Sequence, residues 1–374
     1  MGISSASRQV FLPKKDETMI ASLSAGHAAA TAALIRDRAG KTGPVADELY
    51  LDLGGIKRVR VLCHHPALKE IIIRHLGFCV ASVEGGFDAV IHAWEEPLYN
   101  DFHNEVLGLG LERGDDPYVL LARKEGGSLD IFAEFEYGAG VLRAWDGDDY
   151  YFAFERIDDE SLLRPGHLFV KSLYKILNTP SSSLVHGACV GVDGKGALLC
   201  ARGGRGKSTL AVSAMLKGFE YVSDDYLILE RSDRGLLASP MYSVIALSPG
   251  MRRRLSPDIA PAAFVADNAK KDKLVLNISA WSDSVRRRYP VRIGLFPEIA
   301  DVSEPEVIPC SAVEKGKAIT HMVHSTMTQM LDQGDAAAVV KLVNMLNSLD
   351  FYRILLSPDI LGNVECLRNL LKNI

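Results

Sequence analysis

The chain has 374 residues, of which 48% are hydrophobic and 24% are charged, a composition typical of a globular protein large enough for two domains. Its net charge of −5 gives no overall positive field for nucleic acid, and no run of about 18 uncharged apolar residues predicts a membrane span. Six cysteines without a C-x-x-C pair, and no secretion-signal pattern at the N-terminus, predict a cytoplasmic protein.

The first part of the chain divides into two segments. Residues 1–45 are rich in Ser, Ala, Gly and Lys, and we expect a loosely attached leader whose Ala-rich stretch at 28–35 is compatible with a helix. Residues 46–160 alternate short apolar runs with clusters of Gly, Asp and Asn, which predicts a strand-rich domain with one helix near 66–75. No chemistry is evident in this domain, and it is a candidate for substrate recognition.

Residues 161–374 are predicted to form a mixed α/β domain. A helical pattern at 167–177 ends in Asn178-Thr179-Pro180, which marks a boundary. Two strand-like runs at 185–192 and 197–200 flank the turn Asp193-Gly194-Lys195-Gly196, a hairpin signal. Ser311 with Glu314 forms a capping box, and Ser357 with Pro358 is expected to start the last helix.

A phosphate-binding loop is predicted after the second of these runs. An apolar strand, a glycine-rich turn and a helical pattern follow one another at 196–210, close to the consensus G-x-x-x-x-G-K-[ST]. Lys207 would contact the β and γ phosphates of ATP, and Ser208 would coordinate Mg²⁺. Ala201 replaces the first glycine, so the loop must begin without a positive φ. The residues predicted to bind the nucleotide are Ala201, Arg202, Gly203, Gly204, Arg205, Gly206, Lys207, Ser208 and Thr209.

An acidic pair follows the loop. Gly218 is expected to end the helix, residues 219–223 to form a short strand, and Asp224-Asp225 to stand at its end, which would return both carboxylates to the phosphates. One carboxylate could hold Mg²⁺ and the other accept the proton of an attacking hydroxyl; the alternative is a plain turn. His186 lies in an apolar run, where a lone histidine is more often a packed core residue.

The histidine, lysine and aspartate pair occur in the same order and at similar spacing as in the HPr serine kinase/phosphorylase family, which residues 183–230 resemble. The resemblance implies a P-loop fold related to PEP carboxykinase, Mg-ATP as donor and a serine hydroxyl as acceptor. It also implies catalytic roles for His186, Lys207 and Asp224, with Asp224 as the base, and a metal-binding role for Asp225. The segment that accompanies HPr recognition is missing, which argues against HPr as the acceptor.

The predicted function is therefore an ATP-dependent kinase that phosphorylates a hydroxyl of a peptide or small molecule. Two alternatives stay open: an ATPase or nucleotide-dependent switch, and a scaffold with a degenerate nucleotide site. Lys271 and Lys273 are further candidates for a phosphate or adenine contact, while the arginine runs at 252–254 and 286–288 are interpreted as solvated or phosphate-facing loops. The sequence is compatible with a monomer or an oligomer.

Overall fold

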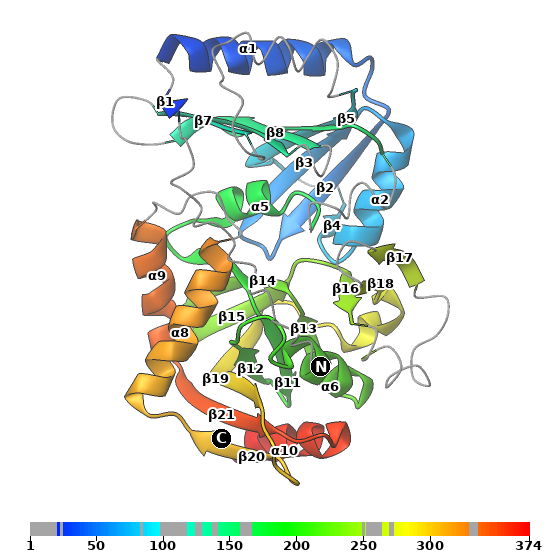
Figure 1. Cartoon of the computed structure of the whole chain (residues 1–374). Helices are drawn as coiled ribbons and strands as arrows, with labels where there is room; N and C mark the ends of the chain where they lie inside the picture. Colours follow the sequence, from blue (N-terminus) through cyan, green and yellow to red (C-terminus); the bar gives the residue numbers. More distant parts are fainter. Residues whose placement is uncertain are drawn as a thin grey trace, which may run out of the picture.

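The computed structural model describes residues 21–22, 25–82, 85–97, 118–123, 129–136, 141–157, 167–248, 251, 264–268, 273–328 and 336–374. Within these residues the strands form two large sheets and one small sheet, and helices cover their faces (Figure 1). Both large sheets contain parallel and antiparallel pairs. The predicted mixed α/β class is therefore confirmed, while the relationship to PEP carboxykinase stays a prediction.

The first sheet contains the strands of the N-terminal half, in the order β1-β6-β7-β8-β9-β5-β3-β2-β4. Buried Val59, Val61 and Cys63 alternate with more exposed residues in β3, the pattern of a strand with one covered face. The strands are β1 (Ala21–Ser22), β2 (Asp47–Leu53), β3 (Lys57–Cys63), β4 (Val80–Ala81), β5 (Ala89–Glu95), β6 (Tyr118–Arg123), β7 (Leu129–Glu136), β8 (Val141–Asp146) and β9 (Asp149–Phe154).

Two helices lie on opposite faces of this sheet (Figure 1). Helix α1 (Ala25–Lys41) packs on β5 to β9 and buries Ile35 and Ala39. Residues 25–41 of the predicted leader thus pack against the sheet as a helix. Helix α2 (Pro66–Leu76) packs on β2 and β3 with its apolar face. The division into three segments itself stays a prediction.

The second sheet carries the predicted phosphate-binding loop. Its order is β10-β14-β15-β19-β12-β11-β13, and β21 joins β19 and β20. The strands are β10 (Ser182–His186), β11 (Ala188–Val192), β12 (Lys195–Leu199), β13 (Glu220–Ser223), β14 (Tyr226–Ser232), β15 (Gly235–Pro240), β19 (Tyr289–Ile299), β20 (Glu306–Pro309) and β21 (Asp350–Leu356). A small sheet of β16 (Val244–Leu247), β17 (Phe264–Asn268) and β18 (Lys273–Asn277) lies beside it.

Helices surround the second sheet (Figure 1). Helix α6 contacts β11 and β13, α8 contacts β10, and α10 contacts α6 and β21. The helices are α5 (Val170–Leu177), α6 (Lys207–Leu216), the 3₁₀ helix η3 (Ser279–Ser284), α8 (Ala312–Met327), α9 (Ala336–Asn347) and α10 (Ile360–Asn373).

Several expectations about individual elements are refined. The hairpin at 193–196 joins β11 and β12 as predicted, but the run 185–192 breaks at Gly187 into two strands. A Cβ at Gly187 would lie 2.4 Å from Cε of Met322, so this break also brings the backbone close to α8. Helix α5 begins at Val170 rather than at His167, since Phe169 has a φ of 59°.

The two helix starts predicted near the C-terminus have different outcomes. Ser311 and Glu314 form the predicted capping box of α8. The cap of α10 is Asp359, whose carboxylate accepts from the N–H of Leu361, rather than Ser357. The hydroxyl of Ser357 instead accepts from the N–H of Asp359 and shapes the preceding turn.

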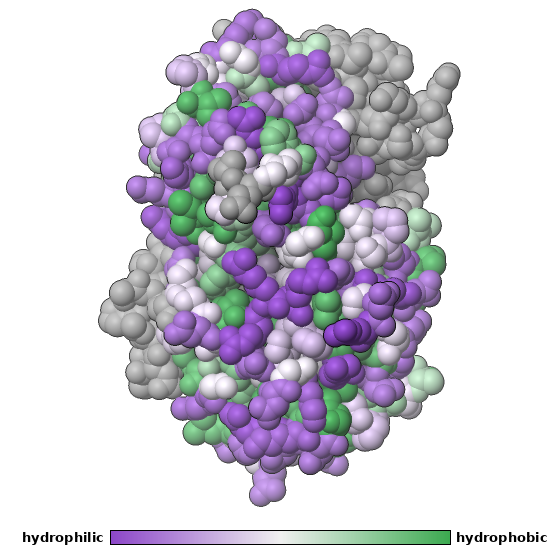
Figure 2. All heavy atoms as spheres, turned by 180° about the vertical axis from the view of Figure 1, so that it is seen from behind, coloured by the Kyte–Doolittle hydropathy of each residue, from purple (hydrophilic) through white to green (hydrophobic). Residues whose placement is uncertain are grey.

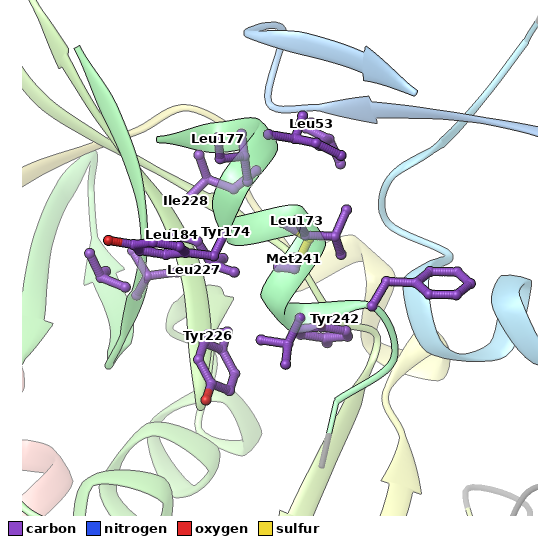
Figure 3. Close-up of a cluster of buried hydrophobic side chains, with 14 of the residues drawn as sticks. Leu53, Leu173, Tyr174, Leu177, Leu184, Tyr226, Leu227, Ile228, Met241 and Tyr242 are labelled. Atoms are coloured by element: carbon purple, nitrogen blue, oxygen red, sulfur yellow. The ribbon is translucent and has the colours of Figure 1, made fainter. Parts of the chain in front are cut away.

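The two large sheets share one hydrophobic core. Figure 3 shows Leu53 of the first sheet facing α5, whose Leu173 and Leu177 lie between it and residues of the second sheet. Leu173 and Leu177 are fully buried. At roughly 1.5 to 3 kcal/mol for each buried side chain of this type, this layer is a substantial part of the folding free energy. The sheets are therefore joined by a continuous core.

The opposite face of the molecule is largely hydrophilic, with apolar residues in separate small areas (Figure 2). Exposed large apolar residues such as Phe87, Val313 and Val340 lie in different parts of the chain, as is usual at a protein surface. In the described part of the chain, no helix combines the length and apolar character needed to cross a bilayer.

Candidate active site

The glycine-rich loop lies where the sequence predicts it, between β12 and α6. Gly206 is the residue before α6 and has a φ of 93°, and Gly204 has a φ of 77°. A Cβ placed on Gly203 or Gly204 would meet no atom within 4 Å, so the outer side of the loop faces open space. Ala201 has no positive φ, as predicted for this position. Such a loop in front of a helix N-terminus presents N–H groups to an anion.

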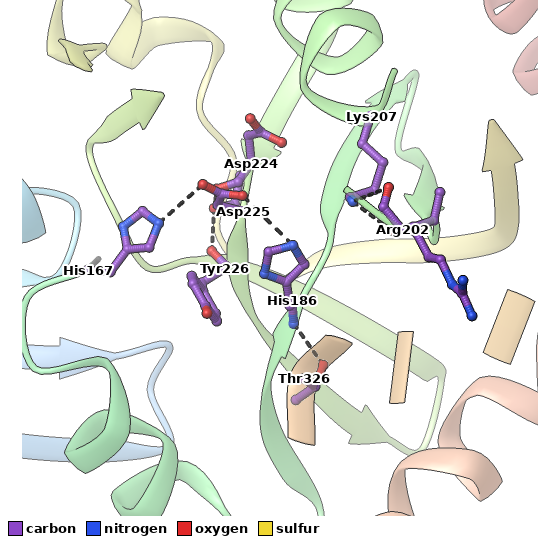
Figure 4. Close-up of polar contacts among 10 residues, drawn as sticks. His167, His186, Arg202, Lys207, Asp224, Asp225, Tyr226 and Thr326 are labelled. Carbon is purple, nitrogen blue, oxygen red and sulfur yellow. Dashed lines mark hydrogen bonds and ion pairs between the residues drawn. The ribbon is translucent and has the colours of Figure 1, made fainter. Parts of the chain in front are cut away.

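Lys207 folds back over this loop. Its side chain is buried, and Nζ donates to the carbonyl oxygens of Ala201 at 2.6 Å and of Arg202 at 3.4 Å (Figure 4). These carbonyls hold the ammonium group at the first residues of the loop, where its positive charge would attract a bound phosphate chain. Arg202 itself is exposed.

Strand directions bring the acidic pair to the loop. Strand β13 is antiparallel to β11, which is antiparallel to β12, so β13 runs in the same direction as β12. Asp224 and Asp225 follow β13 and therefore lie at the edge of the sheet where the glycine-rich loop begins. Gly218, with a φ of 81°, ends the preceding helix as predicted. The two aspartates thus lie at the same end of the sheet as the glycine-rich loop, as the sequence predicts.

Asp224 is a buried carboxylate. It is 2% exposed, and its Oδ1 has no hydrogen-bond partner among the described residues. Burial, and secondly the neighbouring charge of Asp225, raise the pKa of Asp224 to about 7, although the Ser208 hydroxyl and Lys207 act in the opposite direction. Asp224 thus lies on the side of the pair that faces the loop and α6.

Asp225 lies between two histidines (Figure 4). Its Oδ2 is 3.2 Å from Nε2 of His167 and its Oδ1 is 3.9 Å from Nε2 of His186. Its φ of 70° is uncommon for a residue other than glycine, although aspartate tolerates it better than most. The carbonyl of Asp225 accepts from the N–H of Gly187 at 2.9 Å, which fixes the backbone of the pair to the end of β10.

His186 is brought to the pair by strand register. It lies opposite Tyr226 in the β10–β14 ladder, and its ring packs edge-on against Tyr226 at 5.1 Å. Its N–H donates to Oγ1 of buried Thr326 in α8 at 3.0 Å. Sequence reasoning identified His186 but neither Thr326 nor His167, because their contacts with this region depend on tertiary packing and no local motif marks them.

The site fits a nucleotide with a divalent cation. A buried carboxylate oxygen without a partner next to a serine hydroxyl is a donor set suited to Mg²⁺, which prefers oxygen and keeps several waters. In the described residues, no three His, Cys, Asp or Glu side chains form a metal cluster of their own. Ser208 and one or both aspartates would therefore hold the ion together with the phosphates.

The other candidate residues have varied positions. Lys273 opens β18, whereas Lys271 and the arginine run 252–254 lie outside the described residues. Arg286 pairs with Glu220 at 3.2 Å and Arg288 with Glu230 at 2.9 Å, so this arginine run makes ion pairs with strands of the second sheet.

No protein-family model matches the chain. Among curated proteins it is similar to the HPr kinase/phosphorylase of two strains of Leptospira biflexa serovar Patoc, Patoc 1 / Ames and Patoc 1 / Paris. Identity to each is 27% over 198 residues, which span 49% of this chain and 58% of the relative.

Among solved structures, the chain is similar to the HPr(Ser) kinase/phosphatase from Coxiella burnetii. Identity is 13%, the match covers 51% of this chain and 97% of that one, and the TM-score is 0.27, which does not establish a shared fold. The conclusion on the family rests on the two curated relatives. They confirm the predicted resemblance: over about half of its length, this chain is similar to HPr kinase/phosphorylase.

Proposed function

We propose that this chain is an ATP-dependent kinase that transfers the γ-phosphoryl group to a serine-type hydroxyl of a peptide or a small molecule. The observation that carries the proposal is the buried carboxylate of Asp224 beside the Ser208 hydroxyl and the Lys207 ammonium group, at the start of a helix that follows a glycine-rich loop. The likeness to HPr kinase/phosphorylase supports the same reaction class.

Each residue has a definable task in this reaction. Backbone N–H groups at 203–208 bind the phosphates, and the Nζ of Lys207 exchanges its carbonyl partners for phosphate oxygens. The acceptor hydroxyl oxygen attacks phosphorus, its bond to phosphorus forms as the bridging P–O bond breaks, and ADP leaves. Mg²⁺ held at the site would neutralise charge on the phosphates.

Asp224 is proposed as the base that takes the acceptor's proton, and Asp225 with Ser208 as protein ligands of Mg²⁺. A pKa of about 7 suits a base that works near neutral pH. The contact of Ser208 with Asp224 supports the reverse assignment. Two single variants separate these assignments. Loss of the base lowers kcat with Mg-ATP affinity retained, whereas loss of a metal ligand also raises the Mg²⁺ requirement.

Binding is tested first, by thermal unfolding with and without Mg-ATP. A ligand at a hundredfold excess over its Kd should stabilise the protein by about 2.7 kcal/mol. Lys207→Ala should lose most of this shift, while Lys217→Ala, at the other end of α6, should retain it. If Mg-ATP does not change the thermal unfolding of the parent protein, the assignment of a nucleotide site is contradicted.

Transfer is tested with ATP labelled at the γ-phosphate and a library of serine-containing peptides. Label on a peptide supports the kinase. Release of labelled phosphate to water alone would favour the ATPase or switch alternative, and neither product would favour a scaffold. Asp224→Asn should lower the rate of transfer by about 10² to 10⁴.

A further inference from the structure

His167 is a second histidine at the acidic pair, contributed from outside the predicted motifs. It stands immediately before α5, 14% of its side chain is exposed, and its Nε2 is 3.2 Å from Oδ2 of Asp225. An ionised carboxylate only accepts hydrogen bonds, so Nε2 of His167 is the donor whenever Asp225 is ionised. Asp225 is therefore contacted through both oxygens, by His167 on one side and by His186 on the other (Figure 4).

The ring of His167 is fixed by aromatic neighbours. Its centroid is 4.4 Å from that of Tyr242 and 5.0 Å, edge-on, from that of Tyr226. The Tyr242 hydroxyl donates to the carbonyl of Leu168 at 2.8 Å, which ties the backbone next to His167 to the same tyrosine. These contacts hold the ring in the orientation in which Nε2 faces Asp225.

The loop that carries His167 is also anchored in the first sheet. Phe169, two residues on, is buried against Phe152 of β9 with ring centroids 4.5 Å apart. On the other side, Ser243, next to Tyr242, receives the N–H of Gly77 and donates its own N–H to the carbonyl of His75, at the end of α2. Elements of the N-terminal half thus hold both His167 and the tyrosine on which it packs.

We propose that His167 is a positioning residue of the candidate active site, which holds the Asp225 carboxylate in its working orientation from the side opposite His186. The proposal rests on the proposed function. The backbone of Asp225 lies in the left-handed region, which is uncommon for a residue other than glycine, and the two histidines contact its carboxylate from opposite sides. A hydrogen bond to a charged group that is largely shielded from water is strong enough to do this.

The test is a double-mutant cycle between His167 and Asp225. His167→Phe keeps an aromatic ring against Tyr242 and removes the donor, and His167→Gln keeps an N–H donor of similar reach. Rates of phosphate release from Mg-ATP and the Mg²⁺ concentration for half-maximal thermal stabilisation by ATP are measured for each, alone and with Asp225→Asn. Neither readout requires the acceptor: the release rate is the slow background hydrolysis of a kinase without its acceptor, and where this rate is too low to measure, the Mg²⁺ concentration alone decides.

His167→Phe is expected to change the rate or the Mg²⁺ requirement about tenfold in the parent and less than about twofold in Asp225→Asn, with His167→Gln intermediate. Stabilisation by ATP in EDTA should be unaltered. Equal effects in both backgrounds, or equal loss in the Phe and Gln variants, would overturn the positioning role. If His167→Phe does not fold, Tyr242→Phe replaces it, because this variant removes the hydrogen bond to the carbonyl of Leu168. It must then change the rate or the Mg²⁺ requirement in the same direction, by a smaller factor. If the parent protein shows neither phosphate release nor thermal stabilisation with Mg-ATP, the result refutes the proposed function and not the role of His167.

Discussion

Replacing Asp224 by asparagine should stabilise the protein in the absence of ligands. The substitution preserves shape and removes a charge from a position that is 2% exposed, where one carboxylate oxygen has no partner among the described residues. Burial without full compensation makes the ionised form costly, which is why the pKa of Asp224 rises from 3.8 to about 7. An amide at this position carries no such cost of ionisation.

The size of the effect follows from proton linkage. Because the folded pKa lies above the unfolded value, the folded state binds more protons between the two. The contribution of Asp224 to the stability of the parent therefore falls as the pH rises from about 4 to about 7 and is constant above that range. A difference of about three pKa units corresponds to about 4 kcal/mol. A buried amide still costs free energy, so we expect Asp224→Asn to gain about 1 to 3 kcal/mol at pH 8.

Urea unfolding of both proteins at pH 5 and pH 8 measures this gain, provided that nucleotide and Mg²⁺ are absent. The advantage of Asp224→Asn should be larger at pH 8. Asp225→Asn is the matched control: its side chain is 22% exposed and contacts two histidines, so the same change should give no gain. An Asp224→Asn variant no more stable than the parent at pH 8, or with the same advantage at both pH values, would refute the reasoning.

Two further outcomes are expected. Gly206→Ala should destabilise the ligand-free protein by about 1 to 3 kcal/mol in urea unfolding, because φ is 93° and a Cβ would lie 2.5 Å from Cδ1 of Leu356. Gly203→Ala, with open space around it, is the control. Equal losses of stability in the two variants would contradict this explanation. In thiol labelling of the folded protein, Cys310 and Cys366 should react ahead of the other four cysteines, which are fully buried, and early labelling of a buried thiol would contradict the packing.

The parts of the site that the sequence could predict are those set by neighbouring residues. The turn at 193–196, the glycines before Lys207 and the glycine that ends α6 each impose a backbone conformation within a few residues. The return of Asp224 to the loop follows from the length of one helix and one strand. Such features need no knowledge of distant contacts.

The parts that the sequence could not predict depend on packing between distant segments. The strand run at 185–192 breaks at Gly187, where the backbone lies close to α8, and α8 begins more than a hundred residues later. His167 looks like the start of a helix in the sequence, yet the left-handed Phe169 excludes it from α5 and leaves its ring beside Asp225. The residues next to Gly187 and His167 in the sequence do not indicate that a strand breaks at the first or that the second lies outside a helix.

The same packing bears on how the two halves of the chain are related. A change from strand-rich to mixed composition near residue 160 suggests separate units, and the two large sheets do lie on either side of that point. Apolar residues from both sheets nevertheless share one cluster that includes α5, and Phe169, two residues after His167, packs against Phe152 of the first sheet. If His167 orients Asp225 as we propose, the N-terminal half acts on the acidic pair through its core.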